Sequence, residues 1–539
     1  MNKLHKLLLF FIIVGAITLR FYNLGNVPPG LHADGAAQGF NAFSILKTGK
    51  DMYGKDFPIL FRANGSYQPP IYTYLTIIPT IFLGNSIFTV RFISALSGVG
   101  LVLLTYLLIS HFGSKNKNDG ITAGLIAAAM VAISPWSIHF SRLAVEANLG
   151  VLIFGIGTYL LLASLKKISL FPVAALILGI STHAYYSERI IAVLLLGLLV
   201  FINRKIFLKA KKMTILGLGI FGLVLLPHFY LLTTGALTKR LSQVSYLGNA
   251  GEGTGFFVNI LYTVKQFINH YLIYFSPKNL FFDPGSSLGR TTPDLGVLYP
   301  WMVVFFLVGL GYFFRNRKTT FAKLFLILLI VAPIPAGLTG DLFYPLRTLD
   351  YLWVVSIMVA YGFFEFWKVI KSNWVRAAVV FGLVGYSLAV FGVSYFVIFK
   401  YELANSSGKP YIDLMPILTQ YPDKKIMVDF SSRAWGAGIR STYLTSADPL
   451  SVQANLISQM NSSYYSSDVN AQEVFTVGNV SFEILNWNKV CGKDVIIVGD
   501  ELSFDQTKTE EHELDLLFTV PDYLNKPILF GYSTRRLCK

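Results

Sequence analysis

The chain has 539 residues, of which 54% are apolar, 15% aromatic and only 14% charged. Soluble globular domains carry about 25% charged residues, so this composition excludes a soluble protein and indicates one that crosses a membrane several times. The 45 Lys+Arg residues outnumber the 29 Asp+Glu residues by 16, but the basic residues lie in short clusters between apolar runs, which is typical of a membrane-topology signal rather than a nucleic-acid surface.

Eleven stretches are predicted to span the membrane, since a span needs about 20 apolar residues. They lie near 7–19, 88–111, 120–138, 147–165, 169–186, 190–203, 213–232, 297–314, 321–339, 345–367 and 377–399. No small-x-small cleavage site follows the first stretch, so we interpret it as an uncleaved span. The apolar stretch 71–83 contains Pro79 and is short for a crossing, which predicts a re-entrant or interfacial helix.

The basic clusters predict the topology. If 71–83 does not cross, the clusters all fall on one face, which the positive-inside rule identifies as cytoplasmic. They lie near residues 3–6, 115–117, 166–167, 204–212, 315–318 and 368–376. The N-terminus is then cytoplasmic, and three long polar segments share the outer face of the plasma membrane.

These outer segments define the expected domains. Residues 1–400 are predicted to form a helical membrane domain with outer loops 22–70 and 233–294, and residues 401–539 a soluble extracytoplasmic α/β domain. Four strand-like runs favour the latter, at 426–430, 495–498, 516–520 and 528–530. Cys491 and Cys538 both lie there, and whether an oxidising compartment joins them in a disulfide stays open. Two cysteines exclude a disulfide-rich scaffold and a cysteine-based metal site.

The first outer loop holds the strongest candidate for chemistry. Pro28-Pro29-Gly30 predicts a turn, residues 36–46 have helical spacing, and Gly49 ends the helix. Asp34 stands at the expected N-cap position, where a carboxylate commonly does no more than cap the helix. Its place just outside the first span favours a second role, because it would reach a lipid headgroup while facing water.

Several motifs resemble the C-type (GT-C) membrane glycosyltransferases, and within them the protein mannosyltransferase and aminoarabinose transferase branch. The resemblance covers about the first 400 residues. Its motifs are Pro28-Pro-Gly-Leu-His-Ala-Asp34, Gly39-Phe-Asn-Ala-Phe-Ser-Ile-Leu-Lys-Thr-Gly-Lys-Asp-Met-Tyr-Gly54, Gln68-Pro-Pro-Ile-Tyr72, Phe88-Thr-Val-Arg-Phe-Ile-Ser-Ala-Leu-Ser-Gly98, Ser134-Pro-Trp-Ser-Ile-His-Phe-Ser-Arg142-Leu-Ala-Val-Glu146, Tyr185-Tyr-Ser-Glu-Arg189, Pro333-Ile-Pro-Ala-Gly-Leu-Thr-Gly-Asp341 and Pro345-Leu-Arg347. Each string is weak alone, and their order and loop placement carry the resemblance.

The resemblance implies a reaction. A sugar leaves a polyprenyl-phosphate carrier and joins an acceptor hydroxyl or amine of a protein, lipid or cell-wall glycan at the outer membrane face, with inversion at the anomeric carbon. The acidic residue of the first loop, here Asp34, would be the general base, because the attacking hydroxyl must lose its proton. The family usually has an Asp-Glu pair at this place, and this chain has Gly35 as the second member.

Three arginines are candidates for the carrier phosphate. Arg142, Arg189 and Arg347 each lie at the outer end of a predicted span, and a guanidinium suits the charge that grows on a leaving phosphate. The alternative is that they snorkel or pair with neighbouring carboxylates, namely Glu146, Glu188 and Asp350.

Secondary candidates are Glu146, His32, Tyr185 and Asp51. Glu146 follows Arg142 by four residues, so on one helix the two would share a face. The spacing of His32 and Asp34 is the only faint hint of a metal site, because no histidine stands in HExxH spacing. The sequence requires no cofactor and leaves a divalent metal open.

The loop 233–294 contains an aromatic stretch, 259–282, that would suit an interfacial helix, either as a wall for the carrier lipid or as a packed outer helix. The main functional alternative is a transporter or flippase of an amphiphile, and a third is a binding protein anchored by its spans. The polar loops gather on one face, whereas transporters show related halves, so we favour the transferase. Its expected partners are the lipid-linked sugar, the bilayer and an acceptor of unknown class, with no nucleic acid.

Overall fold

The structure is a computed structural model that describes residues 2–247, 255–283, 291–429, 436–470, 473–490, 493–504, 509 and 512–534. The chain divides into two compact units. The first, which we call the helical unit, comprises Met1–Tyr22, Ser94–Thr233 and Leu237–Ser394. The second, the mixed unit, comprises Asn23–Ile93, Thr234–Ala236 and Tyr395–Lys539. Asp34 thus falls in one unit with the C-terminal residues, whereas the sequence placed its loop in the membrane domain.

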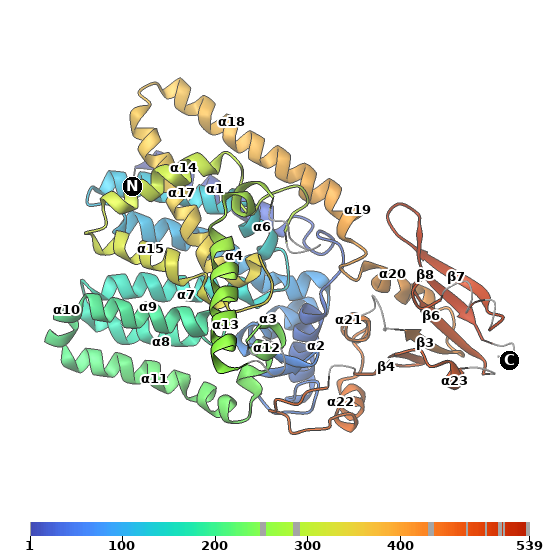
Figure 1. Cartoon of the computed structure of the whole chain (residues 1–539). Helices are drawn as coiled ribbons and strands as arrows, with labels where there is room; N and C mark the ends of the chain where they lie inside the picture. Colours follow the sequence, from blue (N-terminus) through green and yellow to red (C-terminus); the bar gives the residue numbers. More distant parts are fainter. Residues whose placement is uncertain are drawn as a thin grey trace. The chain divides into compact units, whose positions relative to one another are not determined.

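The helical unit contains the long apolar helices (Figure 1). Its elements are α1 (Lys3–Phe21), most of α4 (Ile87–Phe112), α5 (Lys117–Ile133), α6 (Pro135–Ser141), α7 (Glu146–Ser164), η1 (Ile168–Leu170), α8 (Phe171–Ser181), α9 (Glu188–Ile202), α10 (Arg204–Lys209), α11 (Lys211–Thr233), most of α12 (Ala236–Val244), α13 (Phe256–Leu272), η2 (Ile273–Phe275), η3 (Lys278–Phe282), α14 (Met302–Arg315), α15 (Thr320–Val331), α16 (Ile334–Gly337), η4 (Pro345–Thr348), α17 (Leu349–Val369) and α18 (Asn373–Gly392), and η5 (Val393–Ile398) begins at its end.

All eleven predicted spans are helical over most of their length, but they differ in length. Seven helices in the described part of the chain are long and apolar enough to cross a membrane, and α5 with α6 would make an eighth although they are bent by 59°. The predicted spans over α8, α9 and α14 are shorter helices. An apolar helix shorter than the hydrocarbon core can still cross where the bilayer thins locally or where flanking side chains snorkel to the interface.

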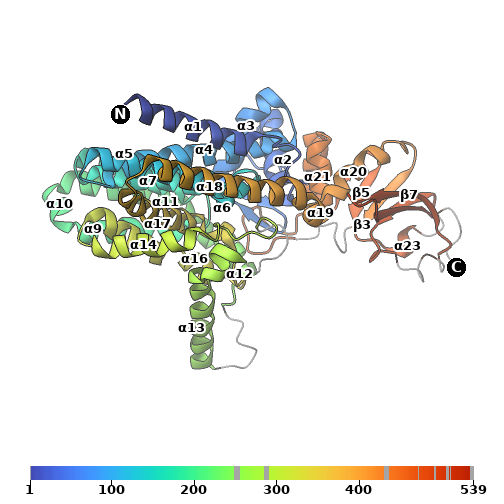
Figure 2. The ribbon, with the colours of Figure 1, turned by 90° about the horizontal axis from the view of Figure 1, so that it is seen from above.

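Helix α13 extends away from the other helices of the helical unit (Figure 2). Phe256, Phe257 and Leu261 are each at least 69% exposed, although the helix is strongly apolar on that side. Aromatic and aliphatic side chains exposed along one helix face are typical of an interfacial helix. The end of the helix packs on its neighbours, because His270 is buried and the Tyr271 hydroxyl donates to the Ile330 carbonyl oxygen, so the alternative of a packed outer helix also stays open.

The mixed unit combines helices with a small sheet. Its elements are α2 (Ala33–Thr48), β1 (Phe61–Ala63), β2 (Ser66–Gln68), α3 (Pro70–Leu83), α19 (Phe399–Leu403), α20 (Lys409–Leu418), β3 (Lys425–Asp429), α21 (Ala437–Leu444), α22 (Pro449–Ser458), β4 (Phe475–Val477), β5 (Val480–Glu483), α23 (Trp487–Val490), β6 (Val495–Gly499), β7 (Asp515–Pro521) and β8 (Pro527–Ser533). The predicted helix in the first loop is confirmed as α2, and Gly49 ends it in the left-handed conformation.

The C-terminal sheet has six strands in the order β4-β5-β3-β6-β8-β7. Strand β3 pairs in parallel with β5 and β6, while the outer pairs are antiparallel. Strand β6 is buried along its whole length, as expected where parallel strands lie inside a sheet. The four strand-like runs predicted from sequence are confirmed as β3, β6, β7 and β8, and the sequence missed the short strands β4 and β5.

Candidate active site

The chain leading into α2 is fixed by a buried arginine on α4. Arg91 donates hydrogen bonds to the carbonyl oxygens of Leu24, Pro28 and Gly30, at 2.9, 3.0 and 2.6 Å. Gly30 has φ +80°, a conformation that favours glycine, and a Cβ there would lie 2.3 Å from an atom of Ser407. Arg91 and Gly30 therefore fix the conformation of the loop that leads into α2.

Asp34 lies in the first turn of α2, and the predicted N-cap assignment is wrong. The helix begins at Ala33, so His32 is the N-cap residue and its side chain makes no cap bond. The exposed Asp34 carboxylate is thus not used to close the helix end. A carboxylate in the first turn is a common arrangement, because the N-terminal end of a helix carries partial positive charge.

Two amide side chains hold one oxygen of this carboxylate. Asn64 Nδ2 and Gln68 Nε2 donate to Asp34 Oδ1 at 3.0 and 3.1 Å, and Gln68 also reaches the Asp34 carbonyl oxygen at 3.2 Å. Within the described ranges no hydrogen bond is made to the second oxygen, Oδ2. The carboxylate is therefore oriented through one oxygen and presents the other.

The hairpin β1–β2 places both amides. Phe61 pairs with Gln68 and Ala63 with Ser66, so only two residues, Asn64 and Gly65, form the turn. Both have positive φ, 52° and 70°, which is the requirement of the tightest hairpin turns and the reason why Asn-Gly is favoured there. An Asn-Gly pair between short strands was a signal in the sequence that could have located this hairpin.

A cation from the C-terminal part of the chain acts on Asp34. Arg440 on α21 is 5% exposed and donates from Nε to the carbonyl oxygen of Leu31 at 2.5 Å. Burial lowers the pKa of Arg440 to about 10, while Tyr411 and the Asp34 carboxylate act in the opposite direction. The charges of Arg440 and Asp34 also both act on His32. The mixed unit thus holds a buried guanidinium within electrostatic reach of Asp34.

Nothing in the sequence marked Arg440, because it lies about 400 residues from Asp34 in a segment with no recognised motif. Two glycines allow the close packing here, Gly408 against Arg440 and Gly436 against the start of α2. A Cβ on Gly408 would lie 2.4 Å from the Arg440 Cζ, and a Cβ on Gly436 would lie 2.3 Å from the Ala33 Cβ. Both glycines have positive φ.

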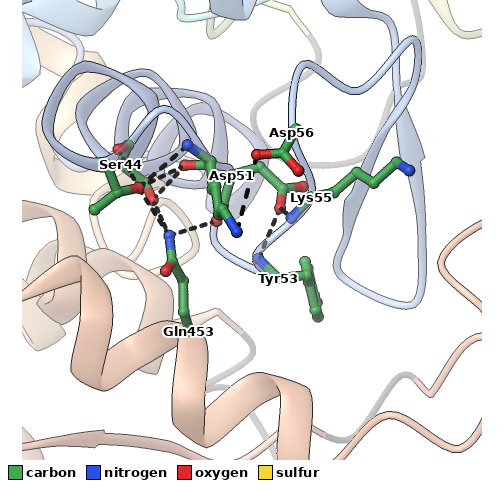
Figure 3. Close-up of polar contacts among 8 residues, drawn as sticks. Ser44, Asp51, Tyr53, Lys55, Asp56 and Gln453 are labelled. Carbon is green, nitrogen blue, oxygen red and sulfur yellow. Dashed lines mark hydrogen bonds and ion pairs between the residues drawn. The ribbon is translucent and has the colours of Figure 1, made fainter.

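Asp51 organises the rest of the first loop (Figure 3). Its Oδ1 accepts the backbone N–H groups of Tyr53 and Lys55, both at 2.9 Å, and its Oδ2 accepts the hydroxyl of Tyr464. Its carbonyl oxygen accepts Gln453 Nε2 at 3.0 Å. Burial raises the pKa of Asp51 to about 6, and these hydrogen bonds partly offset that effect. Asp51 is fully buried, so it acts as a structural carboxylate of this loop.

Arg142, in the helical unit, is engaged at a helix end. It is fully buried, and it donates to the carbonyl oxygens of Leu19 and Tyr22, at 2.9 and 2.7 Å, at the end of α1. Arg142 thus donates to carbonyl groups that have no hydrogen-bond partner within the helix, because they lie at its C-terminus. It favours the structural alternative for Arg142 that the sequence left open.

The expected shared helix face of Arg142 and Glu146 is wrong. Helix α6 ends at Ser141 and α7 begins at Glu146, so residues 142–145 form a break between two helices and the four-residue spacing does not apply. Arg347 also differs from its expected pairing, because its Nη1 contacts Asp341 Oδ2 at 2.7 Å and Thr339 Oγ1 at 2.6 Å. Its guanidinium lies 4.5 Å from the centre of the Tyr344 ring.

Arg189 retains hydrogen-bonding capacity. Its guanidinium lies 4.5 Å from the centre of the Tyr186 ring, and Nε donates a long bond, 3.4 Å, to the Thr182 carbonyl oxygen. Its buried Nη2 has no hydrogen-bond partner among the described residues. A buried guanidinium nitrogen without a partner costs free energy unless a ligand or water satisfies it.

Two histidines stand beside Arg189 and were not expected from the sequence. The rings of His183 and His228 stack with centres 4.1 Å apart, and the charge of Arg189 acts on both. His228 Nε2 lies 2.9 Å from Thr182 Oγ1, whose own hydrogen goes to the Gly179 carbonyl oxygen. His228 Nε2 is therefore the donor, and its buried Nδ1 has no partner within the described part of the chain.

Three helices of the helical unit have a carboxylate in their first turn. Glu146, Glu188 and Asp350 lie in the first turns of α7, α9 and α17, and their charges interact. Glu188 and Asp350 are at most 2% exposed, and each has one oxygen without a partner among the described residues. Tyr185 lies within electrostatic reach of Glu146 and Arg347. The structure therefore brings Glu146, Tyr185 and Arg347 together.

The structure leaves a divalent metal open, as the sequence does. The amide nitrogens of Asn64 and Gln68 donate to the Asp34 carboxylate, and the buried Gln68 Oε1 has no hydrogen-bond partner among the described residues. In the described ranges no three His, Cys, Asp or Glu side chains converge as a metal site. Cys491 and Cys538 lie outside the described residues, so their pairing stays a prediction.

Comparison with known structures identifies the fold. The chain resembles ArnT, the aminoarabinose transferase, from Cupriavidus metallidurans bound to undecaprenyl phosphate, with a TM-score of 0.59, 13% identity and coverage of 98% of both chains. It also resembles the Archaeoglobus fulgidus oligosaccharyltransferase in the apo form, with a TM-score of 0.53, 14% identity and coverage of 99% of this chain and 75% of that one.

The same archaeal enzyme, AglB, in complex with an inhibitory peptide and a dolichol-phosphate gives a TM-score of 0.50 at 13% identity, covering 99% of this chain and 74% of that one. No protein-family model and no curated protein matches the chain. The predicted fold class, a GT-C-like helical membrane protein with a C-terminal α/β region, is confirmed.

Proposed function

We propose that the chain is a membrane glycosyltransferase that moves a sugar from a polyprenyl-phosphate carrier to an acceptor hydroxyl or amine. The fold it shares with ArnT and the oligosaccharyltransferase supports this, because one of those structures binds undecaprenyl phosphate and another a dolichol-phosphate. The same comparison favours a transferase over the transporter or flippase. The N-terminus would be cytoplasmic, and Asp34 and the C-terminal residues would face the outer side of the plasma membrane.

Asp34 is the general base in this proposal. Its Oδ1 is held by two amides and its Oδ2 makes no hydrogen bond to the described residues, so Oδ2 is the oxygen that would accept a proton. As the acceptor oxygen or nitrogen attacks the anomeric carbon, its proton passes to Oδ2, and the bond from that carbon to the phosphate oxygen breaks. Attack opposite the leaving group inverts the anomeric centre.

Arg440 places a positive charge near the base. Its buried guanidinium lies within electrostatic reach of Asp34. The amides of Asn64 and Gln68 orient the carboxylate, since both donate to Oδ1. This oriented and exposed carboxylate is the observation that carries the proposal.

The carrier phosphate is the second part of the proposal and concerns the helical unit by itself. Arg189 offers a buried nitrogen without a partner in the described part of the chain. Guanidinium groups stabilise phosphate charge through paired donors. We propose Arg189 and Arg347 as the principal phosphate ligands and the exposed apolar face of α13 as a contact for lipid. Arg142 is the weakest candidate because its donors serve α1.

The test is turnover in membranes that contain the full chain. Undecaprenyl phosphate carrying tritiated mannose, glucose, galactose or 4-amino-arabinose would be supplied, and the loss of label from the lipid fraction would be followed so that the acceptor need not be known. With the donor that the wild type uses, Asp34→Asn should lower the rate by about 10²–10⁴-fold.

The matched control is Asp56→Asn, because Asp56 lies in the same loop, is exposed, and its carboxylate forms a long ion pair with Lys50, 3.9 Å. It should turn over at the wild-type rate. An Asp34→Asn variant that keeps the wild-type rate would remove Asp34 as the base.

A further inference from the structure

A C-terminal segment, residues 461–470, lies against the hairpin β1–β2 within the mixed unit. It contains Tyr464 and Tyr465 between paired serines, and we call it the tyrosine strap. The two tyrosine rings contact each other at right angles, with centres 4.8 Å apart. The strap is separated from the hairpin by about 400 residues of chain, so its contacts there are specified by tertiary structure alone.

The strap holds the first strand through its hydroxyl groups. The backbone N–H of Ile59 donates to the Tyr465 hydroxyl at 2.9 Å, and the backbone N–H of Arg62 donates to the Tyr464 hydroxyl at 3.1 Å. The Tyr464 hydroxyl in turn donates to the buried carboxylate of Asp51. One hydroxyl thus joins β1 to the Asp51 network of the first loop.

The second strand is held by the strap backbone. The Tyr67 hydroxyl donates to the carbonyl oxygen of Tyr464 at 2.7 Å and accepts the backbone N–H of Ser466 at 2.8 Å. Tyr67 is nearly fully buried. Both strands of the hairpin are therefore held by one segment. Each strand has three residues, so the hairpin is too short to be stable without contacts to the rest of the unit.

The same hairpin carries the two groups that orient Asp34. Asn64 occupies its turn and Gln68 ends its second strand, and both donate to Asp34 Oδ1. A displacement of the hairpin would move both donors together. The strap and the carboxylate are thus connected through the hairpin itself, whose backbone carries both the groups bonded to the strap and the two donors to Asp34.

We propose that the tyrosine strap is a positioning element for Asp34, with Tyr464 as its principal residue. This inference rests on the proposed function, since it concerns the rate at which Asp34 accepts a proton. A base acts efficiently only when it is held within a few tenths of an ångström of its working position, and a misplacement of about 1 Å can cost about 10²-fold in rate. A hairpin whose strands have three residues each needs contacts from another segment to reach that precision.

The first measurement asks whether the strap holds the hairpin. Tyr464→Phe removes one hydroxyl and keeps the ring, so in hydrogen exchange of the full chain in nanodiscs the Arg62 amide should exchange about 10-fold faster. Tyr465→Phe should act in the same way on Ile59. The control is Tyr523→Phe, because the Tyr523 ring lies against Lys400 and Tyr401, and it should leave both amides unchanged.

The second measurement asks whether this support acts through Asp34. In the turnover assay Tyr464→Phe should lower kcat by about 10-fold while the affinity for undecaprenyl phosphate stays unchanged. In an Asp34→Asn background the same substitution should cost less than about 2-fold, because the group that it positions is already lost. Tyr465→Phe provides a second variant should Tyr464→Phe fold poorly.

Three outcomes would overturn the inference. They are a Tyr464→Phe variant with wild-type kcat despite faster exchange at Arg62, unchanged exchange at Arg62, and losses from Tyr464→Phe and Asp34→Asn that multiply in the double variant. Wild-type turnover by Asp34→Asn alone would instead overturn the proposed function, so the two failures are distinguishable.

Discussion

The two units differ in how their buried carboxylates are satisfied. In the mixed unit, Asp51 receives hydrogen bonds on both carboxylate oxygens, and the buried Arg440 is bonded to the chain that leads into α2. In the helical unit, Glu188 and Asp350 each keep a buried oxygen without a partner among the described residues, and Arg189 keeps a buried nitrogen. Such atoms are costly where no ligand or water satisfies them. Both units hold further buried polar atoms of this kind, so the comparison shows that the fold uses both oxygens of Asp51, while the buried carboxylates of the helical unit are open to a ligand or water.

The largest expected effect within this comparison is on Arg440. Arg440→Ala removes a charged hydrogen bond to Leu31 and the cation that acts on Asp34. We expect the opening free energy of the start of α2, measured by native-state hydrogen exchange of the full chain, to fall by about 2–3 kcal/mol. Arg440→Lys should recover part of the loss. Unchanged protection in Arg440→Ala would show that the mixed unit does not depend on this contact.

The second prediction concerns the polar groups of the helical unit. If Arg189 contacts the carrier phosphate, Arg189→Gln should weaken binding of undecaprenyl phosphate by about 10- to 100-fold, the value of a charged hydrogen bond. The matched control is Arg315→Gln, because Arg315 is 69% exposed and pairs with Glu365 at 3.4 Å. Equal affinities in the wild type and Arg189→Gln would return Arg189 to a structural role.

The smallest effect is a pH dependence at Asp51. Burial raises the pKa of Asp51 to about 6 in the folded chain, above the usual aspartate value of about 3.9, so the folded state holds the proton more tightly and stability falls as pH rises through this range. Between pH 5 and pH 7 the loss should be about 1 kcal/mol. Asp51→Asn should remove this dependence in thermal unfolding scans, and a variant with the wild-type pH slope would contradict the assignment.

The sequence predicted the local elements well. Pro28-Pro29-Gly30, the helical spacing after it and Gly49 located α2, because turn and cap residues act within a few positions of the chain. The runs that became β3 and β6 were visible because parallel strands are apolar on both faces. The pair Arg142 and Glu146 failed for a local reason as well, since the helix breaks between them.

The tertiary part of the candidate site could not be predicted in this way. Arg440 and Tyr464 lie about 400 residues from the groups on which they act, and no periodicity or spacing connects them. A single arginine or tyrosine in a polar segment looks like a solvated side chain. The expected domain boundary at residue 400 separated them from Asp34 as well. The sequence changes from apolar spans to strand-like runs at that boundary, but the mixed unit combines residues from both sides of it.

The central claim is that the Asp34 carboxylate accepts the proton of the acceptor. The most direct measurement is a single-turnover experiment in which enzyme exceeds the tritiated lipid-linked sugar, so that binding and release do not limit the rate. We predict that Asp34→Asn binds undecaprenyl phosphate as the wild type does and transfers the sugar about 10²–10⁴-fold more slowly. Equal single-turnover rates in the two proteins would contradict the claim.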